Sequence, residues 1–280
     1  MTPKLSVIMP AWNRADKIPH ALASIHNQEL CDIELCVIDD GSTDNTEEVV
    51  RLFRSTTPIR FDLKYKRLEK VGISRARNAG LEMASAPLIA YLDTDNIWTS
   101  ECASTIVETF ENQPDIESAY SRMQFVHADG FEQSILFCPF DRAALLYQNF
   151  IDMNVFAHRR ECVDKYGMFD LSLRRLVDWD LVIRYTQERP PFEIAHTLCN
   201  YLVDETTNRI SVIESMRLAM RSVIEKHLKE IVERDIDELI LKGHPQRHAT
   251  LVQPTWDQYY REILSELEAQ RNSVRKQLNQ

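Results

Sequence analysis

The sequence lacks the features of several common protein classes. Lys and Arg number 33 against 43 Asp and Glu, and the formal charge of −10 argues against nucleic-acid binding, which needs clustered cations. The six cysteines form no CxxC pair and no Cys/His cluster, which argues against a zinc site or a disulfide framework. No apolar run reaches the roughly 18 residues of a membrane span, and the N-terminus lacks the layout of a signal peptide. These absences predict a cytoplasmic protein with no nucleic-acid partner and no transmembrane segment.

Short apolar runs alternate with amphipathic helical patterns in the first half of the chain. We expect strands at residues 5–10, 33–39, 59–65 and 88–93. We expect four helices. The first runs to Gln28 and can be capped by Asp16, and the second begins after Asp44. The third runs from Ser74 to Ala84, and the fourth covers residues 100–112. Strands and helices that alternate at this spacing predict an α/β fold with a mostly parallel sheet covered on both faces.

The pattern changes after residue 112. Residues 118–125 and 133–137 flank a predicted hairpin turn at residues 128–130. Further strands are expected at residues 153–158 and 192–203, and helices at residues 161–166 and 179–188. Beyond Ser211 apolar side chains recur at helical spacing, so we place a domain boundary there. Residues 1–211 would form the catalytic domain, and residues 212–280 a helical extension that packs on it or joins a second copy or a biosynthetic partner.

Acidic residues follow two of the predicted strands. Asp39 and Asp40 come after the second strand, and Asp93 and Asp95 after the fourth. In an open parallel sheet the carboxyl ends of the strands border the ligand crevice. Mn²⁺ or Mg²⁺ bound to a diphosphate would reconcile two such acidic clusters, because these ions take one or two carboxylates together with substrate phosphates. The alternative is that these aspartates are helix caps and turn formers.

Four segments resemble the family 2 glycosyltransferases in their order and spacing. They are SVIMPAWN at residues 6–13, VIDDGSTD at 37–44, GISRARNAG at 72–80 and AYLDTD at 90–95. The resemblance covers roughly residues 4–210. It implies the GT-A fold, a nucleotide-sugar donor and inversion at the anomeric carbon.

The resemblance also implies roles for the residues that bind the donor. The nucleotide base would lie against a stretch of four residues, Pro10, Ala11, Trp12 and Asn13. Asp40 would accept a hydrogen bond from the base, which suits the imide N–H of uracil because a carboxylate only accepts, and Asp39 would order the turn.

The donor's diphosphate and the metal would lie near two later segments. Arg77, near the start of the third helix, would bind the diphosphate. Asp93 and Thr94 of the DxD element would contact the donor. Asp95, the last residue of that element, would be the metal ligand.

A further segment, FDLSLRRLVDWDL at residues 169–181, is similar to the family segment in which a Glu-Asp pair starts a helix beneath the acceptor. Asp178 matches the Asp of that pair and is the predicted general base. Val177 replaces the family's Glu, which is a departure from the pattern. Asp180 is the rival base, and two residues this close on a helix cannot both face the same side.

These residues predict an inverting, metal-dependent glycosyltransferase. It would move a sugar from a UDP-sugar to a saccharide hydroxyl, and the family resemblance suggests bacterial surface-polysaccharide synthesis. A non-catalytic nucleotide-sugar-binding or scaffold domain is the alternative, kept open by Val177. A nucleotidyltransferase is disfavoured, because no Gly-rich loop follows the first strand.

Overall fold

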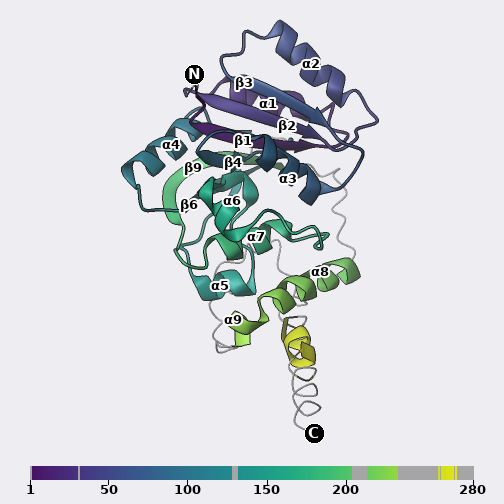
Figure 1. Cartoon of the computed structure of the whole chain (residues 1–280), viewed down its shortest axis with the longest axis vertical. Coiled ribbons are helices and arrows are strands. Elements are labelled where there is room, and N and C mark those ends of the chain that lie inside the picture. Colours follow the sequence, from purple (N-terminus) through teal and green to yellow (C-terminus); the bar gives the residue numbers. More distant parts are fainter. Residues whose placement is uncertain are drawn as a thin grey trace.

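One mixed sheet runs through the computed structural model, which describes residues 2–30, 32–127, 132–203, 213–232, 258, 260–267 and 269 (Figure 1). Within these residues the strands lie in the order β3-β2-β1-β4-β8-β6-β9-β5, and β7 pairs with β6. The part of the chain that the structure describes contains no helix long and apolar enough to cross a membrane.

The N-terminal half is the parallel part of the sheet. Its strands are β1 (Leu5–Ala11), β2 (Ile33–Asp39), β3 (Asp62–Arg67) and β4 (Leu88–Tyr91). The helices that connect them are α1 (Ile18–His26), α2 (Thr46–Thr56) and α3 (Ile73–Met83). β1 pairs in parallel with β2 and β4, and β2 pairs in parallel with β3. The predicted parallel arrangement is confirmed for these four strands.

The second half adds antiparallel pairs. Its elements are β5 (Asn96–Trp98), α4 (Cys102–Asn112), β6 (Ser118–His127), β7 (Glu132–Leu136), α5 (Arg142–Tyr147), η1 (Met153–Val155), β8 (Phe156–Arg159), α6 (Glu161–Tyr166), α7 (Val177–Tyr185) and β9 (Phe192–Val203). β8 lies antiparallel between β4 and β6, and it joins the two halves of the sheet. β6 and β7 form the predicted antiparallel pair, while the turn predicted at residues 128–130 lies outside the described residues.

Several element boundaries differ from the sequence prediction. Residues 153–155, predicted as the start of a strand, form the 3-10 helix η1, so β8 begins only at Phe156. The first helix begins at Ile18 and is capped by Lys17 without a side-chain bond, so Asp16 is not its cap. β3 begins at Asp62 rather than at residue 59, because the N–H of Ile59 donates back to the carbonyl of Thr57 in a tight turn. α7 begins two residues before the predicted start, at Val177.

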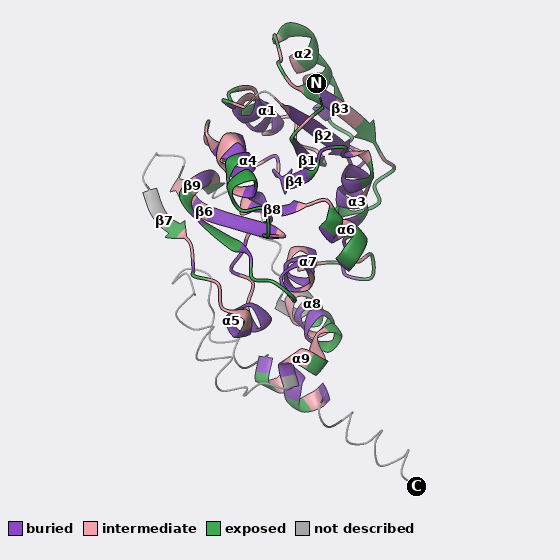
Figure 2. Cartoon of the chain, turned by 60° about the vertical axis from the view of Figure 1, so that its left-hand side comes forward, coloured by how far each residue is buried: buried purple, intermediate pink, exposed green. Residues whose placement is uncertain are grey.

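The two faces of the sheet bury separate apolar clusters, because successive side chains of a strand point to opposite faces. Leu5, Val7 and Met9 of β1 pack in the cluster that includes α1 and α4. Ile8 packs in the other cluster, with α5, α6 and α7. Figure 2 shows the buried strands between these layers. α3 crosses β1 so closely that a Cβ at Gly80 would clash with the side chain of Ile8.

The C-terminal helices extend the second of these clusters. α8 (Ile213–Lys226) and α9 (Leu228–Val232) contribute apolar side chains to it, and so does the helical stretch at residues 260–267. In Figure 1 α8 lies below α7 and α9 lies below α5, at the end of the molecule opposite α2. The hydroxyl of Tyr260 donates to the carbonyl of Leu146 at 3.2 Å. The described parts of the extension therefore pack on the α/β part, whereas the predicted boundary at residue 211 lies outside the described residues.

Candidate active site

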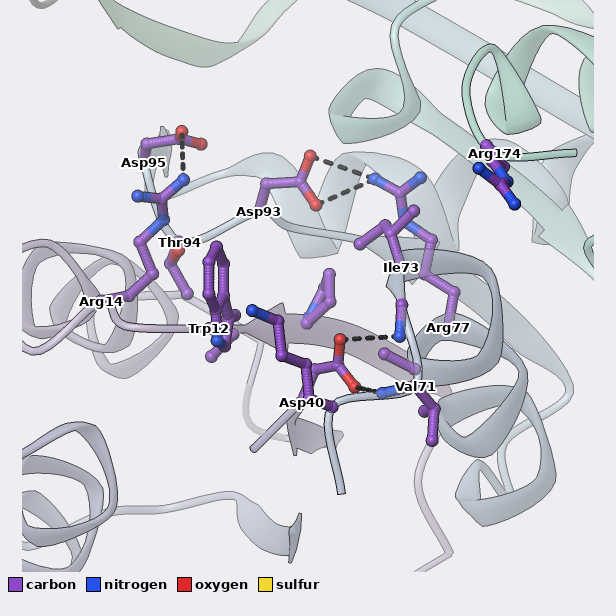
Figure 3. A pocket seen from close by; sticks show the side chains of 15 residues that line it. Trp12, Arg14, Asp40, Val71, Ile73, Arg77, Asp93, Thr94, Asp95 and Arg174 are labelled. Atoms are coloured by element: carbon purple, nitrogen blue, oxygen red, sulfur yellow. Dashed lines mark hydrogen bonds and ion pairs between the residues drawn. The ribbon is translucent and has the colours of Figure 1, made fainter. Parts of the chain in front are cut away.

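A cavity of about 970 Å³ opens where β1, β2 and β4 end and α3 begins (Figure 3). Apolar and charged residues together line this cavity: Pro10, Ala11, Trp12, Arg14, Asp40, Lys70, Val71, Gly72, Ile73, Ala76, Arg77, Asp93, Thr94, Asp95 and Arg174. Four lining side chains are cationic and three are acidic. Such a lining suits an anionic ligand that brings its own cation.

Trp12 forms one wall of the cavity. Its side chain is 45% exposed, and the Nζ of Lys70 lies 4.0 Å from the ring centroid. Asn13 is not among the described residues that line the cavity. Its Oδ1 instead accepts a hydrogen bond from the Thr43 N–H at 2.7 Å. Of the four residues predicted to bind the base, Asn13 therefore shapes the loop after β1, while Pro10, Ala11 and Trp12 line the cavity.

The two aspartates after β2 have different partners. The carboxylate of Asp39 accepts hydrogen bonds from the Ser42 N–H at 2.8 Å and the Tyr65 hydroxyl at 2.7 Å, so it orders the turn. Asp40 faces the cavity and accepts from the N–H groups of Val71 and Gly72, at 2.5 and 2.9 Å. Asp40 thus fixes the start of α3, and each of its oxygens keeps a lone pair for a ligand.

The loop that Asp40 holds lies very close to the end of β2. Gly41 has a φ of +73°, and a Cβ there would come within 2.6 Å of the backbone nitrogen of Lys70. Glycine is therefore required at this position. The N–H groups of the first turn of α3 have no partner within the helix, and they lie beside the cavity, where such groups favour an anion.

Arg77 joins two acidic parts of the site. Its Nη2 donates to both oxygens of Asp93, at 3.0 and 3.1 Å. Burial lowers the pKa of Arg77, but the charges of Asp93 and Asp178 outweigh it and raise the pKa overall. Sequence reasoning assigned this guanidinium to a diphosphate. In the structure it pairs with a carboxylate of the DxD element.

Asp95 has only a distant cationic partner among the described residues. The nearest cation, the Nη2 of Arg14, lies 4.0 Å from its Oδ2, and its Oδ1 accepts from the side chain of Asn96 at 3.0 Å. Burial raises the pKa of Asp95, and the charge of Asp93 raises it further. The described residues contain no group of three or more metal-ligating side chains. Asp95 therefore fits a hard cation that takes most of its oxygens from a bound ligand.

Asp178 lies in the first turn of α7, outside the described lining of the cavity but close to Arg77. The side chain of Asn149 donates to its Oδ2 at 3.1 Å. Burial raises the pKa of Asp178, and the charge of Arg77 opposes that effect. Leu176, just before the helix, has a φ of +55°, a conformation that is uncommon for a residue with a side chain. This left-handed residue sets the direction in which the acidic turn of α7 begins.

Asp180 faces away from Asp178, as the spacing predicts. It is fully buried and contacts Arg184, Lys226 and His227 at 2.9 to 3.0 Å. Burial alone would raise the pKa of Asp180, but these partners hold it well below its usual range. Asp180 therefore ties α7 to the C-terminal helices.

Sequence reasoning missed several charged residues of this region. Arg14, Lys70 and Arg174 line the cavity, but each stands in a loop whose spacing marks no site. Asp152 was also missed; burial, with the charges of Asp93 and Asp178, raises its pKa to about 6. Arg14 could have been noticed as a basic residue that closely follows the first strand. No sequence signal marks Asp152.

Comparison with known proteins agrees with this geometry. The model of the family described as "Glycosyl transferase family 2" matches residues 6–169. The fold is that of the GT-A glycosyltransferases. Because the family model matches more than half of the chain, the protein belongs to glycosyl transferase family 2.

Individual relatives are similar over parts of their length. Validoxylamine A glucosyltransferase of Streptomyces hygroscopicus subsp. jinggangensis is 44% identical over 96 residues, which are 33% of this chain and 22% of the relative. The chain spans between 20% and 39% of the length of the first curated relatives it matches. The similarity to these relatives is therefore confined to part of each.

Solved structures share the fold at low sequence identity. Residues 1–349 of TarS from S. aureus, in a complex with UDP-GlcNAc, superpose with a TM-score of 0.67 at 19% identity, covering 94% of this chain and 80% of that one. The mannosyltransferase PcManGT from Pyrobaculum calidifontis, in complex with GDP-Man and Mn²⁺, gives a TM-score of 0.61 at 16% identity, covering 96% and 76%.

Proposed function

We propose that the protein transfers a sugar from a nucleoside-diphosphate sugar, most simply a UDP-sugar, to a saccharide hydroxyl with inversion at the anomeric carbon. The observation that carries the proposal is that Arg77, in the cavity that Asp93 and Asp95 line, pairs with Asp93 and lies close to Asp178 of α7. Acids from the end of β4 and from α7 come together there. An acid that binds a metal and an acid that takes a proton are the two groups this reaction needs.

The base and the diphosphate of the donor would occupy neighbouring parts of the cavity. The exposed ring of Trp12 offers a face for the base, and the free lone pairs of Asp40 suit the imide N–H of uracil. The first turn of α3 would receive the phosphates. TarS with UDP-GlcNAc supports the choice of a uridine donor, whereas PcManGT with GDP-Man supports a guanosine donor.

A divalent metal fits the acidic side of the cavity. Asp95 would hold it, because Asp93 is already paired with Arg77. The Mn²⁺ in the PcManGT complex supports the use of a divalent metal. When bound, the metal would offset the charge that develops on the departing nucleoside diphosphate.

Asp178 would act as the general base. It would take the proton from the acceptor hydroxyl as the oxygen attacks the anomeric carbon, and the nucleoside diphosphate would leave from the opposite face. Asn149 orients the carboxylate, and the charge of Arg77 favours its ionised form. Val177, where the family has Glu, packs in the apolar core, so the base works without an acidic neighbour at that position.

The test is Asp178→Asn, measured with UDP-sugars and GDP-sugars in the presence of Mn²⁺. We expect transfer to fall by about 10²- to 10⁴-fold, the usual contribution of a general base. Binding of the nucleoside diphosphate, measured by calorimetry, should persist because Asp178 lies outside the donor cavity. NMR of the product should give an anomeric configuration opposite to that of the donor.

Asp164→Asn is the matched control, because Asp164 is exposed on α6 and faces no part of the cavity. It should keep full activity. Unchanged transfer in Asp178→Asn would disprove the base assignment. If the unsubstituted protein binds the nucleotide but transfers and hydrolyses no sugar, the non-catalytic scaffold is the correct function instead.

A further inference from the structure

Asn154 contacts the turn that carries the DxD element, although it is 59 to 61 residues away in sequence. The turn runs from Asp93 to Asn96 and is closed by a hydrogen bond from the Asn96 N–H to the Asp93 carbonyl at 3.1 Å. The Oδ1 of Asn154 accepts the N–H of Asp93 at 2.6 Å. Asn154 is 4% exposed. Its hydrogen bond is therefore shielded from water, and leaving the buried N–H of Asp93 without an acceptor would cost free energy.

The same residue contacts the far side of the turn. The indole Nε1 of Trp98, in β5, donates to the main-chain carbonyl of Asn154 at 3.1 Å. Asp93 stands at the start of the turn and Trp98 follows its end. Asn154 therefore holds both ends of the segment in which Asp95 projects into the cavity.

Asp152 fixes the orientation of the Asn154 amide. Its Oδ1 accepts from the Asn154 N–H and from the side-chain Nδ2, each at 2.8 Å. The Nδ2 also lies 3.5 Å from the Oδ2 of Asp93. With Nδ2 directed at one carboxylate, Oδ1 is directed at the Asp93 N–H, and the side chain has one orientation that satisfies every partner.

We infer that Asn154 is a positioning residue that holds the Asp93–Asn96 turn so that Asp95 can bind the metal–diphosphate of the donor. This inference rests on the proposed function. The chemistry requires an amide, because one atom must accept from a backbone N–H while the other donates to a carboxylate. Aspartate would present only acceptors to Asp152, and alanine would leave the Asp93 N–H without its partner.

The experiment measures UDP affinity with and without Mn²⁺ by calorimetry, alongside the melting temperature of the ligand-free protein. In Asn154→Ala we expect the affinity measured with Mn²⁺ to fall by about 10- to 100-fold, as for other residues that orient a metal ligand. The affinity without metal should be unchanged, because Asn154 holds the Asp93–Asn96 turn and, among the described residues, makes no hydrogen bond with Trp12 or Asp40, the residues proposed to bind the base.

Two further variants separate positioning from general stability. Val155→Ala removes apolar contacts from the same short helix, so it should lower the melting temperature while keeping the gain in affinity from Mn²⁺. Asn154→Asp should lose that gain. The double variant Asp152→Asn with Asn154→Asp should recover part of it, because the new amide at residue 152 can donate to the new carboxylate.

The outcomes are distinguishable. If Asn154→Ala binds UDP with Mn²⁺ as tightly as the unsubstituted protein, the positioning role is wrong. The role is also wrong if Val155→Ala loses the gain equally, or if the double variant recovers nothing over Asn154→Asp. An unsubstituted protein whose UDP affinity does not respond to Mn²⁺ would overturn the metal-dependent function itself, and with it this inference.

Discussion

Nη2 of Arg77 donates to both carboxylate oxygens of Asp93, at 3.0 and 3.1 Å, while the charge of the same guanidinium acts on Asp178. One buried cation therefore compensates acids from the end of β4 and from α7. Its Nε is buried without a hydrogen-bond partner among the described residues. The pKa of Asp178, the proposed general base, is therefore coupled through Arg77 to the acids proposed to bind the metal.

We predict that Arg77→Gln shifts the acidic limb of the pH profile of kcat/KM to higher pH. The charge of Arg77 lowers the pKa of Asp178, so its removal raises that pKa. Asp178 must be ionised to accept a proton, and activity is therefore lost at a higher pH as the solution is acidified. Arg77→Lys keeps the charge and should shift the limb less.

Arg51→Gln is the control for this series, because Arg51 is exposed on α2, away from the cavity. Its pH profile should match that of the unsubstituted protein. A profile of Arg77→Gln that drops in height without moving along the pH axis would show that Arg77 does not tune the base.

A second prediction concerns the stability of the sheet toward acid. Glu34 of β2 is fully buried and accepts hydrogen bonds from Lys64, Ser6 and the N–H and hydroxyl of Ser85. Burial alone would raise the pKa of Glu34, but these partners lower it from 4.5 to about 2. A depressed pKa in the folded state stabilises the protein above the unfolded pKa, and this contribution disappears as the pH falls from about 4.5 to about 2.

Glu34→Gln should therefore lower the free energy of unfolding at pH 7 by about 3 kcal/mol, at 1.36 kcal/mol for each pKa unit. It should also flatten the dependence of that free energy on pH below 4.5. Urea denaturation at a series of pH values measures both. Glu111→Gln, which breaks an exposed pair with Lys4, should change the free energy by less than about 1 kcal/mol. An unchanged acid dependence in Glu34→Gln would contradict the prediction.

The local elements could be predicted from the sequence where one physical signal dominates. β1, β2 and β4 are short apolar runs that end at polar residues, and they lie where expected. The start of β3 was missed because the turn at Ile59 depends on a backbone hydrogen bond rather than on hydrophobicity. The start of α7 was missed because the left-handed backbone of Leu176 has no signal in its side chain.

Which residues contact one another in the site was harder to predict from the sequence than where the site lies. Acids at strand ends indicated where the cavity would lie, because strand ends meet at one edge of the sheet. They did not indicate that Arg77 pairs with Asp93, because that pair depends on how closely α3 crosses β1 beside β4. Nor did they indicate that Asn154 contacts that turn, because this contact arises only when β8 pairs with β4. The amphipathic pattern beyond residue 211 predicted a helix, but it did not indicate against which side chains of the α/β part that helix packs.

The last prediction separates the two acids of α7. Asp180 is buried against Arg184, Lys226 and His227, and it joins the helix to α8 and the residue that follows it. Asp180→Asn should lower the free energy of unfolding by about 3 kcal/mol, because Arg184 and Lys226 lose the fully buried carboxylate that pairs with them. In the folded protein at low temperature kcat should stay close to that of the unsubstituted protein, since Asp180 faces away from the cavity. Glu262→Gln, which breaks a more exposed pair with Arg217, should cost less than about 1 kcal/mol. If Asp180→Asn instead abolished transfer while leaving the free energy of unfolding unchanged, Asp180 rather than Asp178 would be the general base.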